Sequence, residues 1–193
     1  MAYHYLTSPT LARVPDLLDF VSARTGEPSP GTSHRLATYF VHNNGDDAFL
    51  RHTNVVARAQ SGLSSRLVRE ADYLTASVRI PIFSAAFVAA IGSELERDLE
   101  FHRCVVRCRD EEFDDYSVAR VRTVLPLIDE ARSRQRPSAG GGAPILAEPF
   151  FREEYANQFL IARDARYRTM VCSPRLVELV QAHRLKVRFT ATS

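Results

Sequence analysis

Hydrophobic residues follow two spacings along the chain, and the longest regular run covers residues 80–133. Its first apolar stretch, which ends at Phe83, predicts a short buried strand. The hydroxyl of Ser84 can accept a hydrogen bond from an unpaired amide at the start of a helix. The next apolar residues recur at helical spacing and predict the buried side of that helix: Phe87, Val88 and Ile91.

The second half of this run predicts a β-hairpin. Residues Phe101 to Arg109 alternate between two faces, which is typical of a half-buried antiparallel strand. One predicted face carries the chemically interesting side chains, together with Val106: His102, Cys104 and Cys108. An acidic turn at Asp110 to Asp115 and a second strand from Tyr116 to Leu125 complete the predicted hairpin.

The N-terminal third has weaker patterns. It predicts a strand at residues 3–6, a helix at residues 11–21 and a strand at residues 36–42. The run Asn43-Asn44-Gly45-Asp46 is a strong turn signal, so we expect a hairpin that returns through residues 48–52. The stretch from residue 54 to residue 74 predicts only a short helix.

The C-terminal part begins with a stretch rich in Gly, Pro and Ser at about residues 134–145, which predicts a flexible loop within one domain, residues 1–193. A hairpin follows, with its turn at Asp164-Ala165. Ser173-Pro174 predicts the start of a helix, and residues 185–189 predict a last strand. Strand, Ser-capped helix and strand thus occur twice, around Ser84 and around Ser173. The predicted fold is α+β, with helices packed on a mixed, largely antiparallel sheet.

Composition limits the class of protein. Hydrophobic residues make up 45% of the 193 residues, charged residues 25%, and 25 basic against 23 acidic residues leave a net charge of +2. These values are typical of a globular domain, and they argue against a surface dedicated to nucleic acid or membrane. We expect no transmembrane helix and no signal peptide. Three cysteines without the spacing of a disulfide framework favour a reduced, cytoplasmic protein.

No catalytic or metal-binding motif stands out. Cys104, Cys108 or Cys172 could act as a nucleophile beside a histidine such as His102, but cysteine is among the most buried residue types, so packing is the favoured interpretation. His102, Cys104 and Cys108 on one strand lack the spacing of a zinc site. The glycine run at 140–142 lacks the Lys-Ser/Thr of a phosphate-binding loop. We expect no cofactor and no metal.

One cluster is the candidate binding site. Acidic residues surround two aromatic residues in the run Asp110, Glu111, Glu112, Phe113, Asp114, Asp115 and Tyr116. A solvated hairpin tip is the simpler interpretation. The alternative is a projecting acidic and aromatic plug for a basic cleft, in which the charges speed encounter and the aromatic side chains anchor the complex.

Several short motifs resemble a bacterial family of immunity proteins from polymorphic toxin systems, immunity family eleven, formerly a domain of unknown function. The motifs are Ile82-Phe83-Ser84, Leu99-Glu100-Phe101, Asp115-Tyr116-Ser117-Val118, Val124-Leu125-Pro126-Leu127-Ile128-Asp129, Ser133 and, near the C-terminus, Phe159-Leu160-Ile161 and Met170-Val171-Cys172-Ser173. The resemblance covers about residues 78–189. It departs from the family at His102-Arg103, where the family tends to have Leu-Pro, at residues 183–186, and at the acidic hairpin tip, which is this protein's own.

The resemblance implies a protein without catalysis of its own, which binds and neutralises a toxin domain encoded by a neighbouring gene. The acidic and aromatic cluster is then the expected toxin-binding surface. Two alternatives stay open: a small enzyme that uses a His/Cys or carboxylate site, and a nucleic-acid-binding regulatory module. A homodimer is also left open.

Overall fold

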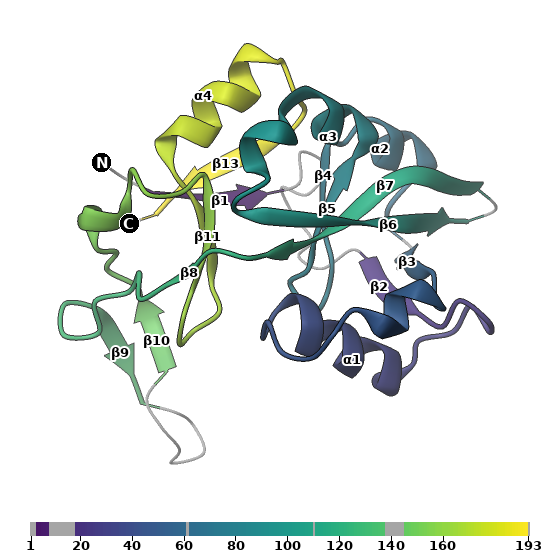
Figure 1. Ribbon diagram of the computed structural model, residues 1–193, viewed down its shortest axis with the longest axis horizontal. Coiled ribbons are helices and arrows are strands. Elements are labelled where there is room, and N and C mark those ends of the chain that lie inside the picture. The colour runs from purple at the N-terminus through teal and green to yellow at the C-terminus, as the bar shows by residue number, and fades with distance from the viewer. Residues whose placement is uncertain (1–2, 8–17, 61, 110, 138–144, 193) are drawn as a thin grey trace.

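The computed structural model describes residues 3–7, 18–60, 62–109, 111–137 and 145–192, and these residues form an α+β fold with two main sheets (Figure 1). The helices are α1 (Pro30–Phe40), α2 (Ser65–Arg69), α3 (Ala85–Ile91) and α4 (Pro174–Ala182), with 3-10 turns at Ala48–Arg51, Ser93–Leu95 and Glu153–Tyr155. The strands are β1 (His4–Thr7), β2 (Leu18–Val21), β3 (Val55–Ala59), β4 (Tyr73–Thr75), β5 (Pro81–Ser84), β6 (Leu99–Cys108), β7 (Glu111–Val121), β8 (Val124–Leu125), β9 (Arg134–Arg136), β10 (Ile145–Glu148), β11 (Ile161–Asp164), β12 (Met170–Cys172) and β13 (Arg188–Ala191).

The larger sheet has six strands in the order β2-β3-β6-β7-β5-β4. All its neighbours are antiparallel except β3 and β6, which are parallel. A bridge between Leu18 and Ala76, together with the bond from the Ser77 amide to the Leu18 carbonyl (2.9 Å), brings the first and last strands of the sheet together. The sheet therefore curls around a core cluster that includes Phe20, Ile82 and Val106.

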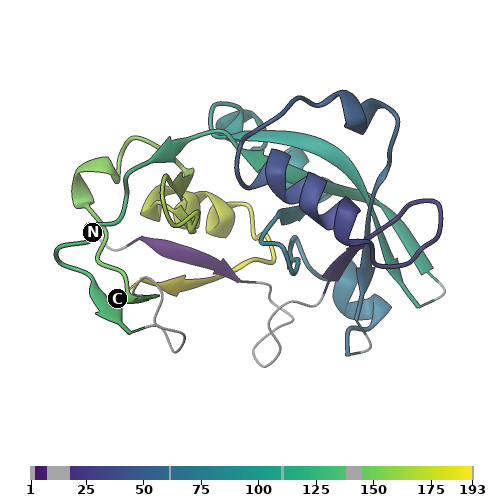
Figure 2. The ribbon, with the colours of Figure 1, turned by 90° about the horizontal axis from the view of Figure 1, so that it is seen from below.

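The second sheet has five strands in the order β13-β1-β12-β11-β8. The N-terminal strand β1 lies between two C-terminal strands and is antiparallel to both, and Figure 2 shows it (purple) beside β13 (yellow), while β8 runs parallel to β11. The two sheets share a hydrophobic cluster that contains the buried faces of α3 and α4. The predicted mixed, largely antiparallel α+β fold is confirmed.

Both helices predicted to follow a serine are present, but only Ser84 makes the predicted capping hydrogen bond. The Ser84 hydroxyl accepts a hydrogen bond from the Phe87 amide (3.1 Å), as its position before α3 predicts. Ser173 occupies the same position before α4, with Pro174 at the first helical position. The predicted hairpins β6–β7 and β11–β12 are also confirmed.

In the N-terminal third, the strand predicted at residues 3–6 is confirmed as β1, but two other predictions were wrong. Residues 18–21 of the predicted helix form strand β2, and residues 11–17 lie outside the described part of the chain. The predicted strand at 36–42 is the end of helix α1, which begins after Ser29. Its buried residues Leu36, Tyr39 and Phe40 are spaced by three and one, which fits one face of a helix as well as a short apolar strand.

The predicted hairpin at residues 36–52 is absent, because the turn signal at 43–46 ends helix α1 and leads into the 3-10 turn at Ala48–Arg51. In the stretch from residue 54 to 74, the predicted short helix is present as α2. Strand β3, which comes before it, was not predicted. The arms of the predicted loop at 134–145 pair as the two-stranded ribbon β9–β10, while residues 138–144 lie outside the described residues. None of the helices in the described ranges has the length and apolar character needed to cross a membrane.

Candidate functional site

The acidic cluster lies on strand β7, at the end of the β6–β7 hairpin that reaches past α2 (Figure 1). It is therefore part of a strand, not a turn as the sequence predicted, and its first residue, Asp110, lies outside the described residues. Cys104 pairs with Tyr116 and Val106 with Phe113, so Asp114 and Asp115 together oppose one residue of β6. This is a β-bulge, and it leaves two consecutive carboxylates on the exposed side.

The two aromatic residues of the cluster point inward. Phe113 and Tyr116 are only 8% and 3% exposed and belong to the core cluster of the larger sheet. The Tyr116 hydroxyl lies 2.5 Å from the Val68 carbonyl oxygen, to which it donates, and 3.1 Å from that of Ala71. The prediction of a projecting aromatic plug was therefore wrong. The side chains of Phe113 and Tyr116 are buried, where they hold the hairpin against α2, and they are not exposed anchors.

The outward carboxylates pair with arginines. Two ion pairs lie on the outer face of the hairpin, Arg107–Glu112 (2.7 Å) and Arg103–Asp114 (3.1 Å), and a third, Arg69–Glu111 (2.7 Å), joins the hairpin to α2. Asp115 is exposed and forms no ion pair with another described residue. The surface thus alternates in sign, and three of its four described carboxylates are balanced by arginine. Since each pair is solvent-exposed, it contributes only about 0–1 kcal/mol to stability.

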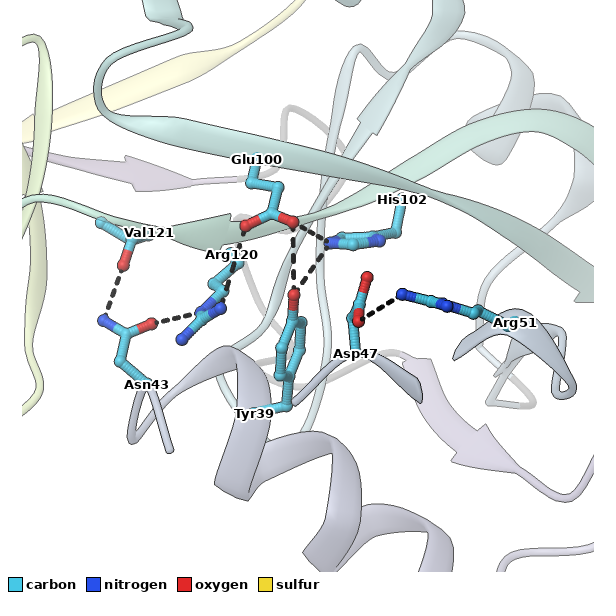
Figure 3. A network of polar contacts seen from close by, with 8 residues as sticks. All are labelled: Tyr39, Asn43, Asp47, Arg51, Glu100, His102, Arg120 and Val121. Carbon is cyan, nitrogen blue, oxygen red and sulfur yellow. Dashed lines mark hydrogen bonds and ion pairs between the residues drawn. The ribbon is translucent and has the colours of Figure 1, made fainter. Parts of the chain in front are cut away.

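Sequence reasoning missed a polar network that joins α1 to the base of the hairpin (Figure 3). Tyr39 on α1 donates a hydrogen bond to Glu100 Oε1 (3.3 Å), and His102 Nε2 lies 3.2 Å from the same oxygen. The Arg120 guanidinium lies over the Tyr39 ring at 4.3 Å, and its Nη1 is 3.9 Å from Glu100 Oε2. This arrangement fixes α1 against both strands of the hairpin.

Burial sets the electrostatics of this network. Desolvation lowers the pKa of His102, and the nearby carboxylates of Glu100 and Asp47 oppose that shift without cancelling it. His102 is also packed edge-on against the Tyr39 and Phe40 rings, at 5.6 and 5.4 Å. The sequence signal for this network is the pair Glu100 and His102, which lie two residues apart on one face of a strand. Their partner Tyr39 lies in a segment that the sequence predicts as a strand, so the contact with helix α1 was not predicted.

The cysteine candidates are core residues. Cys104, Cys108 and Cys172 are all free and fully buried. Burial raises the pKa of Cys104 to about 12 and raises that of Cys172 as well, so both thiols stay protonated at neutral pH. Within the described residues, no three His, Cys, Asp or Glu side chains are grouped to hold a metal ion.

Four cavities among the described residues do not bring the candidate chemical groups together. The three larger ones have volumes of about 470, 350 and 260 Å³ and are lined mainly by residues after position 125. A small one of about 30 Å³ lies between α1 and β3. Glu100, His102 and Cys104 line none of these four, so the polar network does not face any of them. The exposed face of the β6–β7 hairpin is the better candidate for function.

Comparison of the chain with protein-family models and with curated proteins found no match. The surface of the hairpin is therefore interpreted from its own geometry and charge.

Proposed function

We propose that this chain is a cytoplasmic immunity protein, which binds and neutralises a toxin domain encoded by a neighbouring gene, without catalysis of its own. The observation that carries the proposal is the exposed face of the β6–β7 hairpin, defined here by Arg103, Arg107, Glu112, Asp114 and Asp115. The resemblance of the chain's motifs to an immunity family supports the same function.

A surface of alternating charges on a rigid support suits recognition of one partner. The hairpin is held from beneath by the buried rings of Phe113 and Tyr116, so the outward side chains have a fixed backbone. Charge patterns of this kind select the correct partner, because a mismatched partner brings like charges together. Arginine is also enriched among residues that dominate binding energy at interfaces.

The balance of charge changes the expected kinetics. An unpaired acidic tip would attract a basic cleft over a long range and give association that depends strongly on salt. Here Arg69, Arg103 and Arg107 offset most of the acidic charge. We therefore expect a change in the pattern of charges to alter mainly the dissociation rate of the complex. The association rate, which depends on the net charge, should change less.

Exchanging the members of one ion pair tests this function. The double variant Arg103→Asp/Asp114→Arg keeps the net charge and the cross-strand pair, but it inverts the pattern that a partner meets. We expect unchanged stability and a dissociation constant for the toxin domain at least tenfold higher, since interfacial charge mismatches cost about 1.4 kcal/mol or more. The dissociation constant is measured on surface-immobilised toxin domain. Neutralisation is measured by the survival of cells that co-express both proteins.

The matched control is the exposed pair Arg175–Glu178 on α4 (3.4 Å), exchanged in the same way. It should bind and protect like the unaltered chain. If the hairpin exchange also binds normally, the hairpin is not the interface. If the unaltered chain neither binds the toxin domain nor protects cells, the proposed function itself is wrong.

A further inference from the structure

Two segments of the chain repeat the same succession of elements. Strands β5 and β12 begin at Pro81 and Met170, helices α3 and α4 begin at Ala85 and Pro174, and strands β6 and β13 begin at Leu99 and Arg188. The same separation, 89 residues, applies to all three pairs of elements. The hairpin strands β4 and β11 precede them in each segment. We call residues 72–108 unit one and residues 160–191 unit two.

The strand order is also the same in both units. Unit one forms the order β4-β5-β7-β6, and unit two forms the order β11-β12-β1-β13. In each, the third position is filled by a strand antiparallel to both neighbours. That strand is β7 for unit one, and for unit two it is β1, from the opposite end of the chain.

Local geometry agrees at equivalent residues. The capping residues Ser84 (φ −71°, ψ 160°) and Ser173 (φ −76°, ψ 160°) have the same backbone conformation. Arg79 and Arg168, in the two hairpin turns, both have φ of 57°, a left-handed conformation that is uncommon for arginine. A shared backbone conformation at such a residue is not required by the strand order alone.

Hydrogen bonds between backbone amides and carboxylates join the two units at equivalent places. The amide of Lys186, before the last strand of unit two, donates to Asp72 Oδ2 (2.7 Å), before the first strand of unit one. Asp98, before the last strand of unit one, accepts through Oδ2 from the amides of Leu160 (2.5 Å) and Ile161 (3.2 Å), at the first strand of unit two. In both contacts a residue before the last strand of one unit meets the start of the other unit, as in a two-fold interface, although the amide donor and the carboxylate acceptor change places.

The hydrophobic cluster between the units is built from equivalent pairs. Its buried members include Phe83 with Cys172, Phe87 with Leu176 and Ile91 with Val180. Beside it, the fully buried Arg163 donates one hydrogen bond to the Arg79 carbonyl (2.9 Å) and one to the equivalent Arg168 carbonyl (2.8 Å). One guanidinium thus binds the same atom of both units.

We infer that the chain is a fused pseudo-dimer, in which two copies of one structural unit associate through a self-complementary surface. The partner that this surface fits is a second copy of the same unit, and the chain already supplies it. This inference does not depend on the proposed toxin binding, and it assigns a structural role to the surface between the units.

One substitution between the units makes the inference testable. In unit one, the Ser84 amide donates to the Asp72 carbonyl (3.2 Å), and the Ser84 hydroxyl lies 2.5 Å from Asp72 Oδ1. In unit two, the Ser173 amide makes the same bond to the Leu160 carbonyl (2.9 Å). Leucine offers no acceptor, and the buried Ser173 hydroxyl has no partner among the described residues.

If the units are equivalent, an acceptor at Leu160 should restore the missing hydrogen bond. We would measure urea unfolding of the full chain for Leu160→Asn, Ser173→Ala and the double variant. A coupling of about fivefold in the unfolding equilibrium constant is expected, which corresponds to one hydrogen bond. Leu179→Asn, at a similarly half-buried leucine on α4, is the control and should show no coupling to Ser173→Ala.

Absence of coupling between Leu160→Asn and Ser173→Ala would overturn the equivalence of the two units. If Leu160→Asn does not fold, the stabilities of Ser84→Ala and Ser173→Ala are compared instead. Ser84→Ala should raise the unfolding equilibrium constant about tenfold, because it removes a helix cap and the bond to Asp72. Ser173→Ala should change it less than about twofold, since its hydroxyl is unpaired. Equal costs would show that the Ser173 hydroxyl already has a partner, and would overturn the premise that unit two differs from unit one by this hydrogen bond.

Discussion

His102 illustrates how burial, and not a charged partner, decides the behaviour of a titratable residue. Its ring packs against Tyr39 and Phe40, and its Nε2 faces Glu100. Glu100, Asp47 and Arg120 are the charged groups that act on it, yet desolvation is the largest effect and lowers its pKa from 6.5. The folded protein therefore binds a proton on His102 less readily than the unfolded chain.

This lowered pKa predicts a pH dependence of stability. As the pH falls through about 6.5, the unfolded chain takes up a proton at His102 before the folded protein does, so stability decreases. The variant His102→Gln should lose less stability between about pH 7.5 and 5.5 than the unaltered chain, as measured by urea unfolding at both values. His52→Gln, at an exposed histidine, should behave like the unaltered chain. An identical loss in the His102 variant would contradict this explanation.

Single residues show where sequence reasoning succeeds and fails. Ser84 and Ser173 mark the starts of α3 and α4, because a hydroxyl before a helical pattern is a local signal, although only Ser84 makes the capping hydrogen bond. Phe113 and Tyr116 were placed on an exposed tip, because acidic neighbours dominate the local composition. In a regular strand, residues three apart face opposite sides, and only the bulge at Asp114 and Asp115 turns both rings inward. A bulge depends on the partner strand and leaves no local signal.

At the scale of elements, helix α1 is fastened to the hairpin by a residue just beyond its end. Asn43 has a left-handed conformation (φ 54°), and its side-chain nitrogen Nδ2 donates to the Val121 carbonyl (2.8 Å). Its Oδ1 accepts from Arg120 Nε (3.0 Å), as Figure 3 shows. One side chain therefore links the end of α1 to two consecutive residues of β7.

Replacing this side chain should weaken the link without straining the backbone. Asn43→Gly keeps the left-handed conformation but removes both hydrogen bonds, so we expect the free energy of unfolding to fall by about 1–2 kcal/mol. Asn44→Gly, which removes only an exposed bond to its neighbour Gly45, should cost less than about 0.5 kcal/mol. Thermal and urea unfolding measure both. Equal costs for the two variants would show that Asn43 does not anchor the helix.

Helix α1 also shows why short apolar runs mislead. Tyr39, Phe40 and Val41 favour a strand by residue type, and the turn signal that follows suggested a hairpin. The start of the helix, Ser29 before Pro30, is a known pair of signals for capping and first-turn proline. The tertiary contacts of Tyr39 with Glu100 and Arg120, which the sequence alone does not show, stabilise the helical alternative.

For the whole molecule, Arg163 is the buried cation at the junction of the two units. It is fully buried, desolvation lowers its pKa to about 10, and its two terminal nitrogens donate to carbonyls of separate loops. Arg163→Lys should lower the free energy of unfolding by about 2 kcal/mol or more, because an ammonium group lacks the fork that reaches both carbonyls. Arg188→Lys, at an exposed arginine of β13, is the control. Equal stability of the two variants, measured by urea unfolding, would contradict this role.

The α+β class, the starts of helices α3 and α4, and the hairpins β6–β7 and β11–β12 could be predicted, because each depends on short-range patterns. The joining of the sheets could not. It depends on β1 pairing with the far end of the chain and on carboxylates such as Asp98, which accept backbone amides from another unit. The repeat around Ser84 and Ser173 was noticed in the sequence, but its reciprocal contacts required the fold.

The place of β1 between β12 and β13 has a consequence for biosynthesis. Residues that contact each other there, such as Tyr3 and Thr192, are separated by 189 positions. At about 5–20 residues per second, the first strand waits about 10–40 s on the ribosome for its neighbours to be made. The second sheet can then close only after translation of β13, so β1 lacks both of its neighbouring strands while the residues between them are made.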